Sequence, residues 1–265
     1  MKKYWMVFRL SWARQFEYRF NFFFGRMRNI IVLLLLFYVW KSLTLRNGSF
    51  AGYSEIEIIT YVFMVNILRA VIFGNQGITE ITREINQGIF SKYLAMPVNY
   101  FWYNFFRQLA QRLISLISAI IEVVIFAIIL KVDIFAQTNW VILLWFGVSV
   151  FLAICLYFVL SYLTNLLAFF SREAIGPKFL FDWILEFGSG AYFPLSILSR
   201  IFFIPLMFLP FAYLVYFPVE IYLGRVSFWQ ANIGICFQIF WILVAGLITR
   251  IVWKKGLRRY SGEGI

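Results

Sequence analysis

The sequence predicts an all-α, polytopic membrane protein with six transmembrane helices, and three observations support this fold class. First, the 265 residues are 63% hydrophobic and only 14% charged, whereas soluble domains carry about 25% charged residues. Second, several apolar runs reach the roughly 20 residues that a helix needs to cross about 30 Å of hydrocarbon. Third, the basic residues flank these runs and build no separate basic domain, so we expect no nucleic acid partner.

The apolar runs place the six predicted spans at residues 22–40, 56–75, 104–130, 140–170, 177–193 and 232–252. Their orientation follows from the positive-inside rule, because loops rich in Lys and Arg stay in the cytoplasm. With the N-terminus inside, the outer side receives only the basic residues Lys41, Arg46, Lys131, Arg200 and Arg225. We therefore expect a multi-pass protein of the cell (cytoplasmic or inner) membrane, with both termini in the cytoplasm.

Residues 1–21 predict an amphipathic helix that lies in the membrane interface. Its aromatic residues recur at helical spacing, and they are Trp5, Phe8, Trp12, Phe16 and Phe20. Basic residues occupy mostly the other faces, which suits the anionic cytoplasmic surface of a bilayer. The alternative is an ordinary amphipathic helix that packs on protein.

Residues 194–222 predict short re-entrant helices on the extracytoplasmic side, before the last span. This stretch contains Pro194, Pro205, Pro210 and Pro218, and each proline removes a backbone donor and disturbs a straight helix. A seventh crossing would also carry the basic C-terminal stretch outside, against the positive-inside rule. Broken backbone is tolerated at membrane depth where it is buried against protein.

The stretch between the second and third spans, residues 80–97, predicts an amphipathic cytoplasmic helix. Ile81, Ile85 and Ile89 form an apolar stripe at i, i+4 spacing. Gly88 permits either a break into two short helices or the close approach of another backbone. Pro97 cannot continue the helix and ends it. Such a helix, braced by two spans, can receive a push from a soluble subunit or float on the headgroups, and these residues leave both readings open.

The same stretch carries a recognisable pattern. Glu84, Gly88, Leu94 and Pro97 stand in the spacing E-x-x-x-G-x-x-x-x-x-L-x-x-P. This spacing resembles the cytoplasmic segment of the type-2 ATP-binding-cassette (ABC-2) transporter permeases, which are mostly exporters. Ile89 departs from the family, which often has a small hydroxyl residue after the glycine.

A second stretch resembles another element of the same family. The residues Gly190, Phe193, Pro194, Leu195 and Ser196 match its S-G-x-x-F-P-L-S pattern. Pro210, Tyr213 and Pro218 follow, as in the family's broken outer helices. The interfacial N-terminal helix and the order of six spans are similar as well, so the resemblance covers nearly the whole chain.

The resemblance implies a single ABC-2 transmembrane domain over residues 1–265, with an interfacial helix at 1–21, a coupling helix at 80–97 and re-entrant helices at 194–222. It implies ATPase coupling by Glu84, Ile85, Gly88, Ile89, Tyr93, Leu94 and Pro97. It assigns the re-entrant or gate element to Gly190, Phe193, Pro194, Pro210 and Pro218. The implied partners are ATP-binding-cassette ATPase subunits and a second permease chain, in a homodimer or a heterodimer within the lipid bilayer.

ATP hydrolysis is expected in a separate chain. A P-loop needs a Gly-rich turn followed by Lys and Ser or Thr, and this sequence contains no Gly-Lys dipeptide. It also has no His, which removes the usual general base and the commonest metal ligand. We therefore expect no catalytic residue, no metal site and no cofactor bound by this chain, with ATP and Mg held by the partner ATPase.

Three carboxylates fall inside predicted spans, namely Glu122, Asp182 and Glu186. A charge at the bilayer centre costs roughly 2.5 to 3.5 kcal/mol on insertion scales, so these side chains should not face lipid. They could line a path, be protonated, or pair with a basic residue such as Arg69 or Arg112. We favour pairing or neutralisation over direct contact with a substrate.

The function predicted from the sequence is that of a permease subunit in an ABC exporter, driven by separate ATPase subunits. Two alternatives from other classes are an intramembrane enzyme and a membrane scaffold that transports nothing. Serine–histidine chemistry is excluded without His, and no nucleophile stands at a motif spacing from Glu122. The substrate class stays open among amphiphiles, lipids, peptides and glycans.

Overall fold

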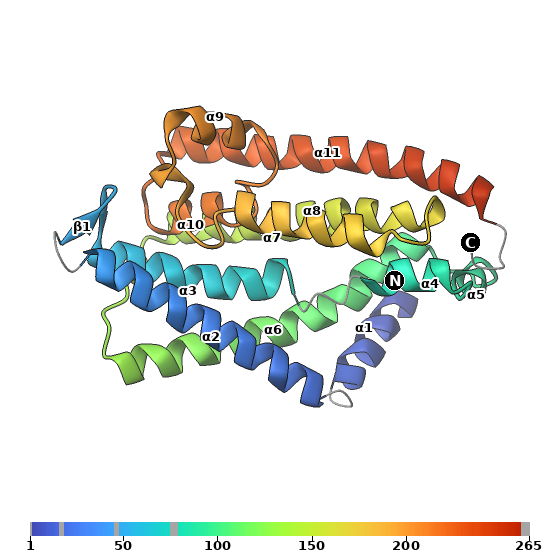
Figure 1. Ribbon diagram of the computed structural model, residues 1–265, viewed down its shortest axis with the longest axis horizontal. Coiled ribbons are helices and arrows are strands. Elements are labelled where there is room, and N and C mark those ends of the chain that lie inside the picture. The colour runs from blue at the N-terminus through green and yellow to red at the C-terminus, as the bar shows by residue number, and fades with distance from the viewer. Residues whose placement is uncertain (1, 16–18, 45–47, 75–78, 261–265) are drawn as a thin grey trace.

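The computed structural model describes residues 2–15, 19–44, 48–74 and 79–260 (Figure 1). The chain is mostly helical, and its long helices run roughly along the long axis of the molecule. These helices are α2 (Arg19–Thr44), α3 (Glu55–Ile72), α6 (Tyr100–Leu130), α7 (Trp140–Asn165), α8 (Ile175–Gly188) and α11 (Phe228–Arg259).

Shorter elements gather at the two ends of this bundle. They are α1 (Lys2–Gln15), α4 (Thr79–Asn86), α5 (Phe90–Leu94), η1 (Leu166–Phe169), η2 (Leu195–Ile197), α9 (Arg200–Phe208) and α10 (Tyr216–Tyr222). Two short strands, β1 (Ser49–Phe50) and β2 (Tyr53–Ser54), pair antiparallel in a small hairpin, and the mostly helical chain is consistent with the predicted all-α class. Figure 1 shows this hairpin at one end of the molecule and α4 with α5 at the other.

Among the residues that the structure describes, four helices are long and apolar enough to cross a membrane. They correspond to the predicted spans at 22–40, 104–130, 140–170 and 232–252. The predicted spans at 56–75 and 177–193 correspond to α3 and α8, which have 18 and 14 residues. Because α8 is only about 21 Å long, it is shorter than the hydrocarbon core it was predicted to cross.

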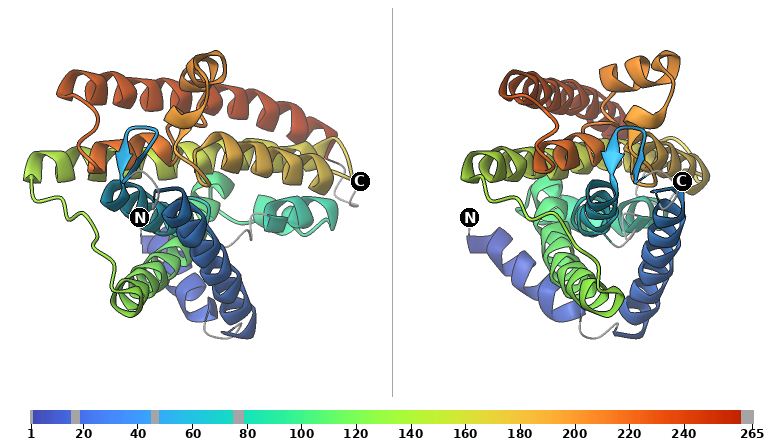
Figure 2. Two further views of the ribbon diagram at one scale, coloured as in Figure 1. Left: turned by 60° about the vertical axis from the view of Figure 1, so that its left-hand side comes forward. Right: turned by 90° about the vertical axis from the view of Figure 1, so that its left-hand side faces the viewer.

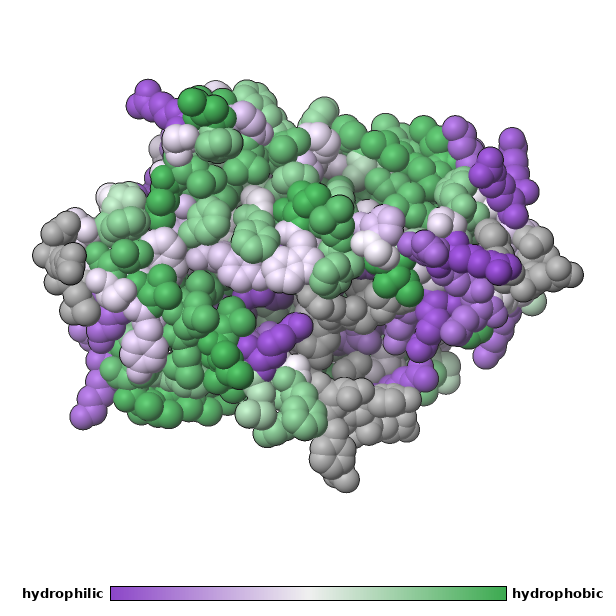
Figure 3. Space-filling view, viewed as in Figure 1, coloured by the Kyte–Doolittle hydropathy of each residue, from purple (hydrophilic) through white to green (hydrophobic). Residues whose placement is uncertain are grey.

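The long helices expose apolar side chains outward, as expected of a protein in contact with lipid. Large hydrophobic residues such as Ile128, Trp140 and Leu243 are mostly solvent-accessible in the isolated chain. Figure 3 shows hydrophobic residues over the middle of the visible face, with hydrophilic residues gathered at the end that carries α4 and the C-terminal turns of α11. The molecule is therefore a multi-pass membrane protein with a polar end.

Helix α3 lies at the centre of the bundle, in contact with α2, α6, α7 and α10 (Figure 2). Most of its residues are buried, among them Tyr61 and Phe63. Its start is fixed by a capping box, in which the Ser54 side chain accepts from the Glu57 backbone N–H and the Glu57 carboxylate accepts from the Ser54 backbone N–H. This central helix runs from the β hairpin into the middle of the bundle (Figure 1).

The N-terminal helix is shorter than predicted. α1 ends at Gln15, and Phe16 lies outside the described residues. The helix packs on α6, where the rings of Tyr4 and Phe106 stack with centroids 5.7 Å apart. Trp5 on α1 stays exposed. The helix therefore combines the two predicted readings, since one face contacts protein and another presents apolar side chains outward.

The proline-rich stretch 194–222 contains short helices with breaks between them. Pro194 precedes η2, Pro205 lies inside α9, and Pro218 lies inside α10. Helix α9 lies beside α11, where the Trp241 Nε1–H donates to the Phe208 carbonyl oxygen at 3.2 Å. These broken helices cover the end of the bundle opposite α4 (Figure 1).

Candidate functional site

Residues 79–97, called here the α4–α5 segment, lie where both terminal regions of the described chain meet. The Tyr260 hydroxyl, after α11, donates to the Gly88 carbonyl oxygen at 3.1 Å. The Lys3 ammonium, on α1, donates to the Pro97 carbonyl oxygen at 2.7 Å. The N-terminal helix, the end of α11 and the α4–α5 segment are therefore on the same side of the bundle.

One face of α4 is buried against the bundle. Ile81 and Ile85 are fully buried, and the Thr82 hydroxyl donates to Asn165 Oδ1 at 2.8 Å beside η1. Ile89, by contrast, is 43% exposed. The predicted three-residue stripe is therefore wrong at its third position, because the helix ends before it.

The end of α4 is made by Gly88. Its φ is +74°, a left-handed conformation that glycine adopts without the steric cost of a Cβ. Its N–H donates to the Ile85 carbonyl oxygen at 3.2 Å, and α5 starts two residues later. Of the two roles expected for this glycine, the structure shows the break into two short helices.

Glu84 ties the two short helices to α6. Its Oε1 accepts from Arg107 NH1 at 2.6 Å and from the Tyr93 hydroxyl at 3.1 Å. Its Oε2 accepts from the Tyr100 hydroxyl. The Glu84 carboxylate and the Arg107 guanidinium are both buried, so each charge requires the other to offset its loss of hydration. Sequence reasoning assigned Glu84 to coupling but missed Arg107 and Tyr100, since no local spacing connects residues on separate helices.

A cluster of aromatic rings packs against the buried face of α5. Phe90 is fully buried, and its ring meets four others edge-on at centroid distances of 4.9 to 5.7 Å. The four neighbours are Tyr100 on α6, Phe169 on η1, Trp253 on α11 and Tyr260. Edge-to-face contacts of this kind favour one arrangement of the rings. Phe90 thus fixes α5 to three other elements, a role that the sequence did not reveal.

The outer surface of the segment is apolar. Ile89, Leu94 and Met96 are 43%, 54% and 40% exposed, and Pro97 is exposed beside them. The predicted coupling residues therefore divide into two groups. Glu84 and Ile85 point inward and support the segment, whereas Ile89, Leu94 and Pro97 lie on its surface, with Tyr93 between the two.

At the opposite end of the bundle, Gly190 shapes the predicted gate element. Its φ is +79°, and an added Cβ would lie 2.9 Å from Tyr216 Cβ and from the Tyr61 hydroxyl. The Tyr61 hydroxyl donates to the Gly190 carbonyl oxygen at 2.7 Å and, at 3.4 Å, to that of Phe193. The turn before Pro194 is thus attached to the central helix α3.

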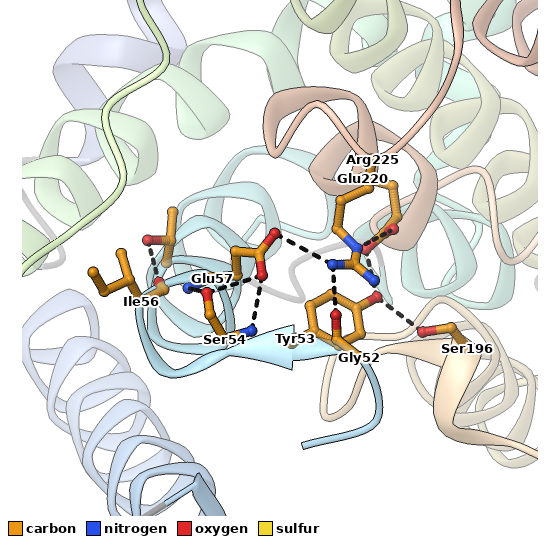
Figure 4. Close-up of polar contacts among 9 residues, drawn as sticks. Gly52, Tyr53, Ser54, Ile56, Glu57, Ser196, Glu220 and Arg225 are labelled. Carbon is orange, nitrogen blue, oxygen red and sulfur yellow. Dashed lines mark hydrogen bonds and ion pairs between the residues drawn. The ribbon is translucent and has the colours of Figure 1, made fainter. Parts of the chain in front are cut away.

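A polar cluster that the sequence did not reveal lies next to this turn (Figure 4). The Tyr53 hydroxyl donates to Glu220 Oε1 at 2.7 Å and shares a hydrogen bond of 2.8 Å with Ser196. Arg225 stacks over the Tyr53 ring at 3.9 Å and lies 3.4 Å from Glu220 and 3.2 Å from Glu57. These contacts connect the β hairpin, α3, η2 and α10.

Burial sets the protonation of this cluster. Removal from water raises the pKa of the Glu220 carboxyl, while the hydrogen bond from Tyr53 and the charge of Arg225 lower it, and the net shift is upward. Burial also raises the pKa of the Tyr53 phenol. The phenol therefore stays protonated near neutral pH and can donate to the carboxylate.

Each of the three carboxylates predicted inside the spans has a basic partner. The pairs are Glu122 with Arg26, Glu186 with Arg69, and Asp182 with Lys178 one helical turn earlier. The Arg26 Nε lies 2.5 Å from Glu122 Oε1. Pairing of this kind removes the need for either charge to face lipid.

Two expectations about basic residues need correction. Arg26 and Lys178 lie near the ends of apolar runs, where a long basic side chain ordinarily extends toward the membrane interface, but both are buried and paired with a carboxylate. Arg112, an expected partner for a carboxylate, is buried beside the Val71 carbonyl oxygen at 3.3 Å and Gln108 at 3.4 Å instead. The partner of Arg26 and the Val71 contact of Arg112 come from packing between helices, which the sequence does not display, whereas Lys178 and Asp182 are one turn apart on α8.

The mostly helical bundle, with lipid-facing helices and a polar end, defines a multi-pass membrane protein. The chain belongs to the ABC-2 family of transporter proteins, because residues 30–264 match the model of the ABC-2 family transporter protein. No curated protein and no solved structure matches the chain. This protein is therefore a membrane permease of the ABC transporter class, which works in general with ABC ATPase subunits.

Proposed function

We propose that this chain is the permease subunit of an ABC exporter of the cell membrane, and that an ATPase subunit docks on the α4–α5 segment. The observation that carries this proposal is an exposed apolar surface on a firmly supported turn. Ile89, Leu94 and Met96 face outward, while Glu84 and Phe90 hold the segment to the bundle. Apolar residues at the centre of a polar surface are typical of protein interfaces.

The contacts that hold the α4–α5 segment can also transmit a displacement of this segment to the membrane helices. A push on the α4–α5 segment reaches α6 through the Glu84–Arg107 pair and α11 through Phe90 and Tyr260. It reaches α1 through the contact between Lys3 and Pro97. In this proposal ATP and Mg bind in the partner ATPase, and closure of two such subunits shifts the membrane helices between inward-open and outward-open or occluded states.

The proposed topology has six crossings, by α2, α3, α6, α7, α8 and α11, in a single transmembrane domain over residues 1–265. Both termini and the α4–α5 segment lie in the cytoplasm, which fits the contacts between them. Helices α9 and α10 dip into the outer leaflet as re-entrant elements, supported by the buried turn at Gly190 and Pro194. In this topology α8 alone is too short to cross the hydrocarbon core, and α9 and α10 fill the outer leaflet above its outer end.

A second permease chain, identical or homologous, completes the substrate route in this proposal. Within the described residues, the carboxylates Glu122, Asp182 and Glu186 each pair with a basic residue of the same chain, and Asp182 Oδ1 alone among their oxygens is buried without a hydrogen bond. One chain therefore offers few free polar groups around a path, whereas two chains can enclose one between them.

Charge substitutions on the exposed surface test the proposal. Leu94→Glu should abolish co-purification with the partner ATPase and reduce transport-linked ATP turnover about tenfold or more, because a carboxylate at the centre of an apolar interface is desolvated. Leu94→Met is the matched control and should retain both, since it keeps the apolar surface. Normal ATPase binding by a folded Leu94→Glu variant would refute docking at this surface.

A further inference from the structure

A groove of about 800 Å³ lies between the α4–α5 segment and the adjoining ends of α6, α7 and α11. One wall comes from the first turn of α6, with Phe101 and Trp102, and the opposite wall from α11, with Leu243, Gly246 and Trp253. This volume is large enough for an acyl chain or a drug-sized molecule. Neither the paired carboxylates nor the gate element contributes to its lining.

One basic side chain in this apolar groove has no counter-ion. Arg250 lines the groove, is exposed, and forms no ion pair with any residue that the structure describes. Tyr162 also lines the groove, but its hydroxyl oxygen is buried. The groove thus combines apolar walls with one exposed cation.

The position of Arg250 along α11 places it at headgroup depth. From Phe228 at the opposite end, Arg250 is about 33 Å along the helix axis, close to the roughly 30 Å of a hydrocarbon core. Lys254, Lys255, Arg258 and Arg259 follow in the last turns. Trp102 and Trp253 lie in the groove wall, and tryptophan is enriched at this membrane level.

We propose that this groove binds an anionic phospholipid of the cytoplasmic leaflet. The phosphate would meet Arg250 at the positive N-terminal end of the long helix α6, and an acyl chain would lie along Leu243, Gly246 and Phe101. Because Tyr93 and Leu94 also line the groove, the bound lipid contacts the α4–α5 segment. Leu94 and Met96 belong both to the groove lining and to the proposed docking surface, so the lipid site is tested at Arg250 and Gly246, which lie outside that surface.

The chain offers matched variants for a test. Gly246 lines the groove, and an added Cβ there meets nothing within 4 Å, so Gly246→Trp should fill the groove without a clash. Gly147→Trp is its control, because Gly147 lies in a helix with equally open space outside the groove. Arg250→Gln removes the cation, and Lys254→Gln removes a neighbouring charge that does not line the groove.

The test uses the full chain in nanodiscs of phosphatidylcholine and phosphatidylglycerol, with a trace of photoactivatable phosphatidylglycerol. Labelled peptides should come from residues 98–102 and 242–253. Arg250→Gln should reduce this labelling about fivefold, the weight of one basic residue at an anionic surface, and Gly246→Trp about tenfold. Both controls should label as the unmodified chain does.

Three results would overturn the proposal. The first is equal labelling by photoactivatable phosphatidylcholine, which would show no preference for an anionic headgroup. The second is unchanged labelling in Arg250→Gln, a surface change that should leave folding intact even if Gly246→Trp does not fold. The third is cross-linking of the groove to a second permease chain in place of lipid.

Discussion

Glu84 connects three helices through one carboxylate, and this explains why a coupling residue can be buried. Its oxygens accept from side chains on α5 and α6, and no part of this arrangement requires contact with another protein. We interpret Glu84 as a support that fixes the orientation of the exposed residues Ile89 and Leu94. A substitution at this position should therefore change stability and coupling together.

Glu84→Ala should lower the stability of the folded chain by about 3 kcal/mol, because it leaves the buried Arg107 charge without its carboxylate. The measurement is the thermal unfolding temperature of the purified protein in detergent. Glu80→Gln serves as the control, since Glu80 is more exposed and lies 3.4 Å from the same guanidinium. A loss no larger than that of the control would contradict the supporting role of Glu84.

Glu220 should give the outer polar cluster a dependence on pH. Burial raises the pKa of this carboxyl in the folded chain above its ordinary value of 4.5, so the unfolded chain releases this proton first as the pH rises. The stability contributed by Glu220 is thus fully present below pH 4.5 and is lost as the pH rises through the folded pKa.

The measurement compares the unchanged protein with Glu220→Gln. The unfolding temperature of the unchanged chain, relative to that of the variant, should fall as the pH rises above 4.5. A relative unfolding temperature that rises with pH instead would mean that the charge of Arg225 outweighs burial in setting the pKa of Glu220.

At the scale of elements, two left-handed glycines shape the two ends of the bundle. Gly88 separates α4 from α5, and Gly190 makes the turn between α8 and η2. Gly88 was singled out from the sequence because a residue without a Cβ permits unusual backbone, and Gly190 because it stands in the pattern that resembles the family. Their surroundings were not predictable, since Tyr61 and Tyr216 reach Gly190 from other elements.

Gly190→Ala should destabilise the chain by about 3 kcal/mol. The left-handed conformation of a residue with a Cβ costs about 1 to 2 kcal/mol, and the contact at 2.9 Å from Tyr216 Cβ adds strain. Gly176→Ala is the control, because Gly176 is helical with open space around it, and it should be neutral or slightly stabilising. Equal unfolding temperatures for the two variants would contradict the role given to Gly190.

The long apolar helices were predictable because lipid-facing residues form continuous runs, and α6, α7 and α11 lie close to the predicted positions. The contacts between distant parts of the chain could not be predicted. The pair of Tyr53 with Glu220 joins residues 167 positions apart, and the pair of Arg26 with Glu122 joins residues 96 apart. Such pairs depend on which helices pack together, and one sequence holds no local signal for that choice.

At the scale of the whole molecule, the account requires that the α4–α5 segment and the β hairpin lie on opposite sides of the membrane. Lys92→Cys should react with a membrane-impermeant thiol reagent only after the cytoplasmic side is opened, whereas Ser49→Cys should react in intact cells. Both positions are exposed, and the native Cys155 and Cys236 are replaced by Ser beforehand. Labelling of Lys92→Cys in intact cells would place the α4–α5 segment outside the cell and contradict the proposed topology.

The central claim is that force from an ATPase enters this permease at the exposed turn around Leu94, and a cross-linking measurement tests it most directly. The account predicts that Leu94→Cys, in a background without native cysteines, forms a nucleotide-sensitive disulfide with a cysteine placed in the cleft of the partner ATPase. Ile201→Cys, which is even more exposed, on α9 at the other end of the bundle, should form none. An assembled, ATP-hydrolysing complex in which Leu94→Cys never cross-links to the ATPase would contradict the account.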